Sequence, residues 1–374
     1  MRGRGDTVTH VYSNSINGFA YSGRGFLPDS RVQSLERDRE VSLGGVGSAT
    51  GRPNSPPPPP APAQTVPTGI QRIGVPGIDG NGANDNDVYQ DVNVAIIDSG
   101  IDGSHPDLNV AGGINFTSTK PQAWKDENGH GTHVAGTVAA LDNAIGVVGV
   151  APGASLWAVR VLNRQGFGSV SGIIAGIDWV TATRGNDGST TNDIAVANMS
   201  LGIYGTTAAL DAAVRASVNA GVVYTVAAMN ESTDASLYSP ARYDVVMTVS
   251  AMADSDGQAG GLGANTWAGP DDTLATFSNY GSSIDIAAPG VDIRSTLLGG
   301  TYGVYSGTSM AAPHVAGAAV RWIVASGTMP QTGLDVKGVR DALVAFARPM
   351  GEWGPNATAS DPDTDHEGLL KISS

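Results

Sequence analysis

The stretch Val92–Ser99, VNVAIIDS, combines a short apolar run with a carboxylate placed directly after it. A run of this length, rich in valine and isoleucine, predicts a buried strand over Val92–Ile97. Asp98 therefore stands at a strand end and is the first candidate for a functional side chain. Further runs of the same kind predict strands at Leu156–Val161, Ile194–Ala197, Val222–Val226 and Val245–Val249.

Two helical patterns lie among these strands, at Val170–Thr183 and at Thr206–Ala220, the second of which ends before Gly221. Strands that alternate with helices predict a parallel sheet that is covered on both faces. We therefore expect an α/β fold in three layers with a mostly parallel central sheet. Ligands of such sheets bind beyond the carboxyl ends of the strands, so functional residues should follow the apolar runs directly.

Composition excludes several classes of protein. The 374 residues include 21 basic and 35 acidic ones, a net charge of −14, which argues against nucleic acid as a partner because phosphate binding needs clustered Lys and Arg. Cysteine is absent, which excludes a disulfide scaffold, a thiolate metal site and a cysteine nucleophile. No apolar run reaches the roughly 18 residues of a membrane span. We therefore expect no membrane partner.

The N-terminal region differs from the rest of the chain. Residues 1–52 carry seven Arg and five acidic residues, whereas the remainder carries 21 − 7 = 14 basic and 35 − 5 = 30 acidic residues. An unbroken proline run, Pro56–Pro60, follows, and such runs form extended, semi-rigid spacers. These shifts predict a linker over residues 53–62 between an N-terminal region, 1–52, and a main domain, 63–374.

Two other segments carry candidates for acid–base and nucleophilic chemistry. His130 stands between two glycines in the segment NGHGTHVAGTV (residues 128–138), and a neutral imidazole titrates near physiological pH. We interpret His133, which lies among small apolar residues, as a packed histidine. Ser309 precedes a small apolar run that predicts a buried helix with Pro313 in its first turn. That places Ser309 near a helix N-terminus, where unpaired N–H groups favour an oxyanion.

Asn230 follows the predicted strand Val222–Val226, and its amide could donate to the same oxyanion. Each candidate has an ordinary alternative: Asp98 as a turn or capping residue, Ser309 as a helix cap and Asn230 as a turn residue. Together they supply a nucleophile, a base, an orienting acid and an oxyanion donor, each at a strand end or a helix start. This combination favours an acyl-transfer site over the ordinary readings.

These segments closely resemble the subtilisin-like serine proteases, over roughly Gln64 to Ala325. The matching pieces are Asn230 and the segments 98–107 (DSGIDGSHPD), 130–138 (HGTHVAGTV), 200–202 (SLG) and 307–317 (GTSMAAPHVAG). The chain order Asp, His, Ser is that of this family. The resemblance implies a serine endopeptidase that works through an acyl-enzyme. Ser309 would be its nucleophile and His130 its base, Asp98 would orient the imidazole, and Asn230 would bind the oxyanion with the N–H of Ser309.

The resemblance also implies binding residues. An extended polypeptide substrate would pair through its main chain with Ser200, Leu201 and Gly202 on one side and with Gly168 and Val170 on the other. A structural Ca²⁺ would stabilise the fold, although segment 141–147 read alone would be an ordinary turn. The ligands of this ion would be backbone or side-chain oxygens of Gln64, Asp107, Leu141, Asn143, Ile145 and Val147.

Two N-terminal segments, Val8–Ala20 and Val32–Val41, resemble the later half of the family's pro-region, which assists folding and occupies the cleft until it is cleaved. The resemblance therefore implies a secreted, monomeric enzyme that is processed between Gly44 and Gln64, with polypeptide substrates and its own pro-region as partners. Because only part of the pro-region is present and no secretion signal precedes it, we expect that Met1 is not the natural start.

Two departures from the family pattern matter. Met229 stands where the family usually has glycine, beside the first specificity pocket. The segment Asp254–Asp272, rich in Gly and Asp, is an insertion that we expect at the surface. The sequence argues against two other functions. A catalytically silent binding scaffold would not need the intact candidate residues, and an esterase or lipase would need a Gly-x-Ser-x-Gly elbow and a different residue order.

Overall fold

The computed structural model describes residues 7–23, 32–43, 62–78, 88–184 and 192–372; the expected linker lies outside this part of the chain apart from Pro62. One sheet dominates the fold. Its strands are β4 (Asn93–Asp98), β5 (Val110–Asn115), β6 (Ser155–Arg160), β8 (Ile194–Met199), β10 (Val223–Ala227), β12 (Met247–Ala253), β13 (Thr273–Leu274) and β14 (Ile286–Pro289).

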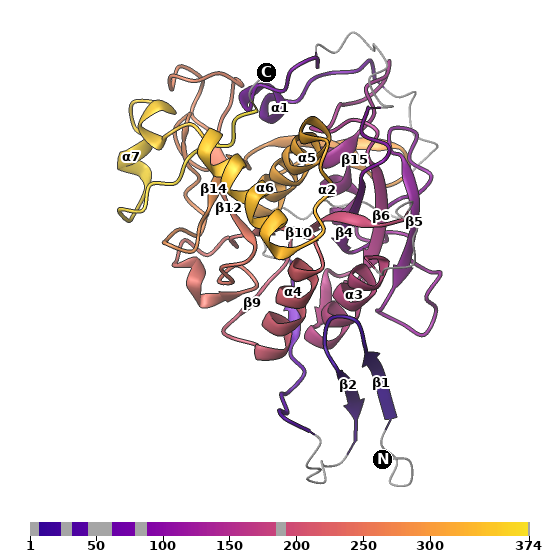
Figure 1. The fold of residues 1–374 in the computed structure, drawn as a ribbon. Coiled ribbons are helices and arrows are strands. Elements are labelled where there is room, and N and C mark those ends of the chain that lie inside the picture. The colour runs from indigo at the N-terminus through magenta and orange to yellow at the C-terminus, as the bar shows by residue number, and fades with distance from the viewer. Residues whose placement is uncertain (1–6, 24–31, 44–61, 79–87, 185–191, 373–374) are drawn as a thin grey trace.

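The order across this sheet is β13-β12-β10-β8-β4-β6-β5, with β14 also paired to β12. All neighbouring strands are parallel except β12 and β13. Helices α2 (His130–Ala139) and α5 (Thr308–Ser326) cover one face, and α3 (Val170–Thr183) and α4 (Ala208–Asn219) cover the other (Figure 1). The expected α/β fold with three layers and a mostly parallel sheet is therefore confirmed.

Burial of apolar side chains holds the layers together. Every residue of β4, β8 and β10 is buried, as in a sheet that packs against helices on both faces. Each fully buried Val or Ile contributes about 1.5–3 kcal/mol by leaving water. Helix α3 has the predicted bounds, and the hydroxyl of Ser169 caps it by accepting the N–H of Gly172 at 3.1 Å. The polar ends of the strands thus meet at one edge of a rigid core.

The N-terminal region packs on the same domain. Strands β1 (Thr7–Tyr12) and β2 (Gly18–Ser22) form an antiparallel hairpin that lies against α3 (Figure 1). Strand β3 (Glu40–Ser42) pairs antiparallel with β7 (Phe167–Ser169). The division of the chain into regions 1–52, 53–62 and 63–374 stays a prediction, because residues 44–61 are not among the described ones.

Smaller elements complete the domain. The antiparallel strands β15 (Ile293–Leu297) and β16 (Thr301–Tyr305) form a two-stranded sheet, and β15 contacts α2. Strand β9 (Ile203–Tyr204) pairs with β11 (Tyr238–Ser239). The remaining helices are α1 (Thr68–Arg72), α6 (Gly333–Phe346) and α7 (Ala357–Ser360), and the 3₁₀ turns are η2 (Ala235–Leu237) and η3 (Met350–Glu352).

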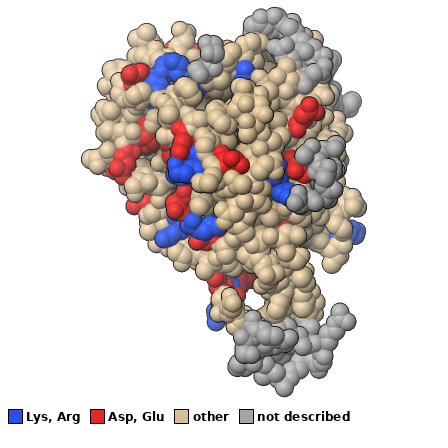
Figure 2. All heavy atoms as spheres, in the orientation of Figure 1, with Lys and Arg blue, Asp and Glu red and all other residues tan. Residues whose placement is uncertain are grey.

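Charged side chains of both signs are interspersed on the face shown in Figure 2. Arg215 of α4 pairs with Asp211 and Asp244, and Arg340 of α6 pairs with Asp285. The exposed pairs of Arg215 contribute little to stability, whereas Asp285 is mostly buried beside Arg340. Among the described residues, no helix is long and apolar enough to span a membrane.

The expectation that the segment Asp254–Asp272 lies at the surface needs a correction. The segment does not lie wholly at the surface, because the side chains of Asp254 and Asp272 are at most 1% exposed and lie beside the guanidinium of Arg72. The buried arginine compensates two carboxylates that the surrounding protein removes from water, and the insertion is thereby tied to helix α1. A third aspartate, Asp271, is also buried, and its carboxylate accepts the N–H groups of Ser255 and Gly263.

Candidate active site

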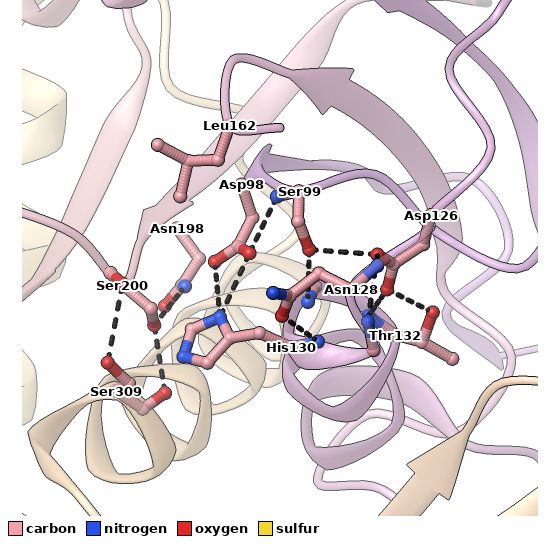
Figure 3. A network of polar contacts seen from close by, with 12 residues as sticks. Asp98, Ser99, Asp126, Asn128, His130, Thr132, Leu162, Asn198, Ser200 and Ser309 are labelled. Atoms are coloured by element: carbon pink, nitrogen blue, oxygen red, sulfur yellow. Dashed lines mark hydrogen bonds and ion pairs between the residues drawn. The ribbon is translucent and has the colours of Figure 1, made fainter. Parts of the chain in front are cut away.

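Asp98 and His130 meet at the carboxyl edge of the sheet. Asp98 ends β4, His130 begins α2, and Nδ1 of the imidazole lies 2.9 Å from each carboxylate oxygen (Figure 3). The carboxylate is fully buried, and its Oδ1 also accepts the N–H of Ser99 at 2.6 Å. A hydrogen bond at Nδ1 keeps the proton on that nitrogen and leaves Nε2 as the acceptor.

The helix start reaches the strand end because residue 131 is glycine. A Cβ atom at Gly131 would lie 2.1 Å from the carbonyl oxygen of Gly100 and 3.2 Å from the Cβ of Asp98. The contact with the backbone of Gly100 excludes a side chain at this position, and the contact with Asp98 is tight. The glycine that follows His130 therefore permits the Asp98–His130 contact.

Asp126 is a functional candidate that the sequence analysis missed. Its Oδ1 accepts the hydroxyl of Ser99 and the N–H groups of Asn128 and Gly129, and its Oδ2 accepts the N–H and hydroxyl of Thr132. Through these bonds the buried carboxylate joins the first turn of α2 to the residue after Asp98 (Figure 3). The available signal was the DENG segment before His130, because an Asp two residues before an Asn is typical of a side-chain turn.

Ser309 is the second residue of α5 and lies at the same edge of the sheet (Figure 3). Its hydroxyl is turned towards Ser200 and donates to that carbonyl oxygen at 3.3 Å. In the described part of the chain, the hydrogen bond of this hydroxyl therefore runs to Ser200 and not to His130. The hydroxyl must therefore leave this hydrogen bond before it can donate to Nε2.

The helix that contains Pro313 begins earlier than the sequence predicted. The sequence predicted Pro313 in the first turn, but α5 begins at Thr308 and the proline lies inside the helix. Proline cannot donate to the carbonyl four residues before it, here that of Ser309. The hydroxyl of Ser200 donates to this carbonyl at 2.8 Å instead. Ser200 thus satisfies the backbone of Ser309 as well as accepting from its side chain.

Asn230 lies beside the N-terminus of α5. Its Oδ1 accepts the N–H of Thr308 at 2.8 Å and the hydroxyl of Thr308 at 3.0 Å. With the carbonyl end of the amide fixed in this way, its NH₂ group is directed away from Thr308. Asn279 holds the loop that carries Asn230. Its Oδ1 accepts the backbone N–H groups of Glu231 and Thr233, and its NH₂ group donates to the backbone carbonyl just before Met229. Neither Thr308 nor Asn279 was predicted.

The residues expected to bind substrate are engaged by the N-terminal region. Strand β3 pairs with β7 opposite Gly168, and the N–H of Val170 donates to the carbonyl of residue 39 at 3.0 Å. On the other side, the N–H of Gly202 donates to the carbonyl of Ser42 at 3.4 Å. Two of the expected substrate-binding residues have other contacts: Ser200 is hydrogen-bonded to Ser309, and Leu201 is fully buried in the core.

Two further histidines have structural roles. His133 is fully buried, donates from Nε2 to the carbonyl of Ile293 and stacks on Tyr305, as the sequence interpretation proposed. Burial lowers the pKa of His133 to about 3 and that of His314 to about 4. Both imidazoles are therefore neutral over the physiological range and add no charge near His130.

All six expected calcium ligands come together. The amide NH₂ of Gln64 donates to the carbonyls of Leu141 and Val147, and that of Asn143 donates to Asp107 at 2.8 Å. Oε1 of Gln64 is buried without a hydrogen-bond partner. Burial raises the pKa of Asp107 to about 6, although hydrogen bonds from Val147 and Asn143 oppose this. Ile145 also belongs to this loop, and its N–H donates to Asn143 at 2.8 Å.

Comparisons with known proteins agree with this arrangement. The model of the subtilase family matches residues 89–363. Subtilisin NAT from Bacillus subtilis subsp. natto is 46% identical over 260 residues, which cover 69% of this chain and 61% of that protein's length. A thermostable alkaline protease from Halalkalibacterium halodurans is 42% identical over 296 residues, which cover 78% of this chain and 66% of that protein.

A solved structure of a cold adapted subtilisin-like serine proteinase has a similar fold. It covers 82% of this chain and 98% of its own chain, with 33% identity and a TM-score of 0.62. The sequence resemblance, the fold and these matches lead to the same result: the chain belongs to the subtilase family.

Proposed function

We propose that this chain is a serine endopeptidase that hydrolyses peptide bonds in proteins through an acyl-enzyme. The observation that carries the proposal is the Asp98–His130 pair, with Nδ1 2.9 Å from both carboxylate oxygens, at the sheet edge where Ser309 lies in the first turn of α5. A carboxylate, an imidazole and a serine at a helix N-terminus are the groups that acyl transfer requires.

In the proposed reaction, the hydroxyl of Ser309 turns from Ser200 to Nε2 of His130 and attacks the scissile carbonyl. His130 takes the hydroxyl proton as the Oγ–C bond forms and gives it to the leaving amine as the C–N bond breaks. Asp98 holds the imidazole and stabilises its charged form. Water then attacks the acyl-enzyme by the same route and releases the acid.

The oxyanion would be bound by the N–H of Ser309 and the side-chain NH₂ of Asn230. The orientation of the Asn230 amide supports this role, because Thr308 donates twice to its Oδ1 and so directs the NH₂ group elsewhere. The partial positive charge at the N-terminus of α5 acts in the same sense. Removal of one such donor typically costs about 10²–10³ in turnover.

The position of residues 40–43 supports the proposal that the N-terminal region is a pro-region. These residues occupy the space between β7 and Gly202 that an extended substrate would take. The N–H of Leu43 donates to the carbonyl of Gly166 at 3.1 Å, so this pairing runs to the residue that precedes the expected processing interval. We expect processing at the start of the interval between Gly44 and Gln64, with the new N-terminus identified by mass spectrometry.

A structural Ca²⁺ is the second part of the proposal. Oxygens of Gln64, Asp107, Leu141, Asn143, Ile145 and Val147 form a set that suits this hard cation. The orphaned Oε1 of Gln64 and the buried carboxylate of Asp107 support the assignment, because both lack the positive partner that a cation would provide. When bound, the ion would join the start of the domain to loop 141–147. Equal rates of thermal inactivation with and without a chelator would contradict this role.

The decisive experiment compares the wild type with Ser309→Ala. We expect the wild type to react with a serine-directed phosphonate and to degrade denatured casein. The variant should do neither, with an unchanged circular dichroism spectrum. A folded wild type that fails to react with the phosphonate would instead identify a binding scaffold. Secretion and a monomeric state stay predictions from the family resemblance.

A further inference from the structure

The side chain of Met229 takes the space between the extensions of two neighbouring strands, which we call the crevice. After the parallel strands β8 and β10, the chain continues as residues 200–202 and 228–230. The side chain of Met229 lies flat against Gly202: a Cβ atom placed there would be 2.6 Å from Sδ, 3.2 Å from Cγ and 3.3 Å from Cε. Met229 is only 4% exposed. A crevice at this edge is where a parallel sheet receives its ligands.

The backbone fixes the direction of this side chain. Met229 has a φ angle of +78°, in the left-handed region that favours glycine. Its N–H donates to the hydroxyl of Thr308 at 3.1 Å, and its carbonyl accepts the N–H of Asn279 at 3.0 Å. Because both peptide groups are held, the methionine cannot leave the crevice by a simple change of backbone conformation.

The crevice borders the path of the bound chain. Ser42 is hydrogen-bonded to Gly202, and Leu43 is hydrogen-bonded to Gly166. An extended chain advances about 3.3 Å per residue, so the next residue of a substrate bound in place of residues 41–43 would pass the crevice. If the carbonyl of that residue is bound by Asn230 and Ser309, as proposed above, its side chain lies beside Met229. In the sequence, residues 44 and 45 are both glycine.

We propose that Met229 determines specificity by occupying the space for the side chain that precedes the cut bond. The occupied crevice admits glycine or alanine and excludes large side chains such as leucine and phenylalanine. The substrate class is therefore polypeptide segments with a small residue before the cut. This inference rests on the proposed peptidase function and adds the residue that sets its preference.

The test uses processed enzyme and peptide 4-nitroanilides of the form acetyl-Val-Ser-Leu-Xaa, which repeat residues 41–43 and vary only Xaa. The quantity measured is the ratio of kcat/KM for Xaa = Phe to that for Xaa = Ala. We expect the wild type to favour Ala by at least tenfold. Met229→Ala and Met229→Gly should raise the Phe/Ala ratio at least tenfold. Two variants are used because glycine relieves the left-handed backbone, whereas alanine shortens the side chain and keeps that backbone.

Met252→Ala is the matched control, since Met252 is a fully buried methionine of β12 that packs in a separate apolar cluster. Its Phe/Ala ratio should equal that of the wild type. The inference is overturned if the wild type cleaves the Phe peptide as fast as the Ala peptide, or if neither Met229 variant changes the ratio. Phosphonate labelling separates the two proposals. A labelled enzyme with an unchanged ratio overturns only the role of Met229, whereas an unlabelled wild type overturns both.

Discussion

The hydroxyl of Ser99 donates to Oδ1 of Asp126 at 2.9 Å, and this bond joins the end of β4 to the loop that begins α2. The proposed orienting acid precedes Ser99 by one residue, and the proposed base follows Asp126 by four. The relative position of the two side chains therefore depends on a second carboxylate, that of Asp126, whose hydrogen bonds are to other residues. A buried carboxylate with five donors is a rigid support, because each donor would lose its partner if the carboxylate moved.

We expect Asp126→Ala to lower kcat about 10- to 100-fold and the free energy of unfolding by about 3 kcal/mol or more, because it leaves buried donors unsatisfied. Asp126→Asn should be milder, since it retains one acceptor oxygen. Glu127→Gln is the control: the side chain of Glu127 is 60% exposed, and its loss should change stability by no more than about 0.5 kcal/mol. Peptidase assays and urea denaturation measure both effects; a fully active Asp126→Ala would contradict the supporting role.

A second prediction concerns the docking of the hairpin β1–β2. The carboxylate of Asp178 on α3 accepts backbone N–H groups of the turn at Ser13, Asn14 and Ser15 at 2.6–3.2 Å. Burial alone would raise the pKa of Asp178, but these hydrogen bonds outweigh it and lower the pKa. The carboxylate is thus a specific acceptor for this turn, and its removal should release the turn.

The experiment uses the uncleaved Ser309→Ala chain. Adding Asp178→Asn should increase hydrogen exchange of the amides at residues 13–15 at least tenfold, because one acceptor oxygen is replaced by an NH₂ donor. Asp211→Asn is the control, since this aspartate lies on the neighbouring helix α4 and pairs with Arg215. Unchanged exchange in the Asp178 variant, read by mass spectrometry, would show that other contacts dock the hairpin.

Calcium affinity should depend on pH through Asp107. Its pKa in the protein without the ion is raised to about 6 by burial, so the carboxylate is ionised above pH 7 and protonated below pH 5. A cation must displace this proton. We expect the dissociation constant for Ca²⁺ to be constant above pH 7 and about tenfold weaker at pH 5 than at pH 8. Calorimetric titration at the two pH values, with Asp107→Asn as the variant that lacks the site, checks this; equal affinities would contradict it.

Glu367 should make stability fall as pH rises. The residue is buried, and burial raises the pKa of its carboxyl to about 7, although a hydrogen bond from Ser250 opposes this. The folded state therefore holds a proton that the unfolded state releases near pH 4.5, and this contribution is lost as pH rises to about 7. Glu367→Gln has no titrating carboxyl at this position. Its free energy of unfolding should therefore rise relative to that of the wild type with increasing pH, by up to about 3 kcal/mol at pH 8.

Urea denaturation of wild type and Glu367→Gln at pH 5, 6, 7 and 8 measures this gain. Asp341→Asn, whose side chain is 59% exposed, is the control and should show no pH-dependent difference from the wild type. A constant difference between Glu367→Gln and wild type across this range would show that the carboxyl titrates normally.

Much of the fold was predictable because buried parallel strands leave long apolar runs. The run at Val92–Ile97 became β4, one residue later, and α3 matched its predicted bounds. Strand β5 (VAGGIN) escaped prediction because two glycines interrupt its apolar pattern. The predicted strand Val245–Val249 became β12, Met247–Ala253, because the chain continues into the sheet beyond the apolar run.

The site was predictable to the level of residue types and not of conformations. The sequence indicated Asp98, His130, Ser309 and Asn230, because each follows an apolar strand or begins a helix. It could not indicate that the hydroxyl of Ser309 donates to Ser200, since a rotamer depends on neighbours that are distant in the chain. For the same reason it missed Asp126, whose partners become neighbours only in the folded protein.

The segment of residues 40–43 is hydrogen-bonded on both of its edges. One edge pairs with β7, and the other pairs with Gly202. Any polypeptide held in this way must offer both sides of its main chain over several consecutive residues. A helix has already used those groups, and so has a strand in the middle of a sheet. Intact globular proteins would therefore resist cutting except at loops, tails and segments that open transiently, and the speed of their digestion would report how often such openings occur.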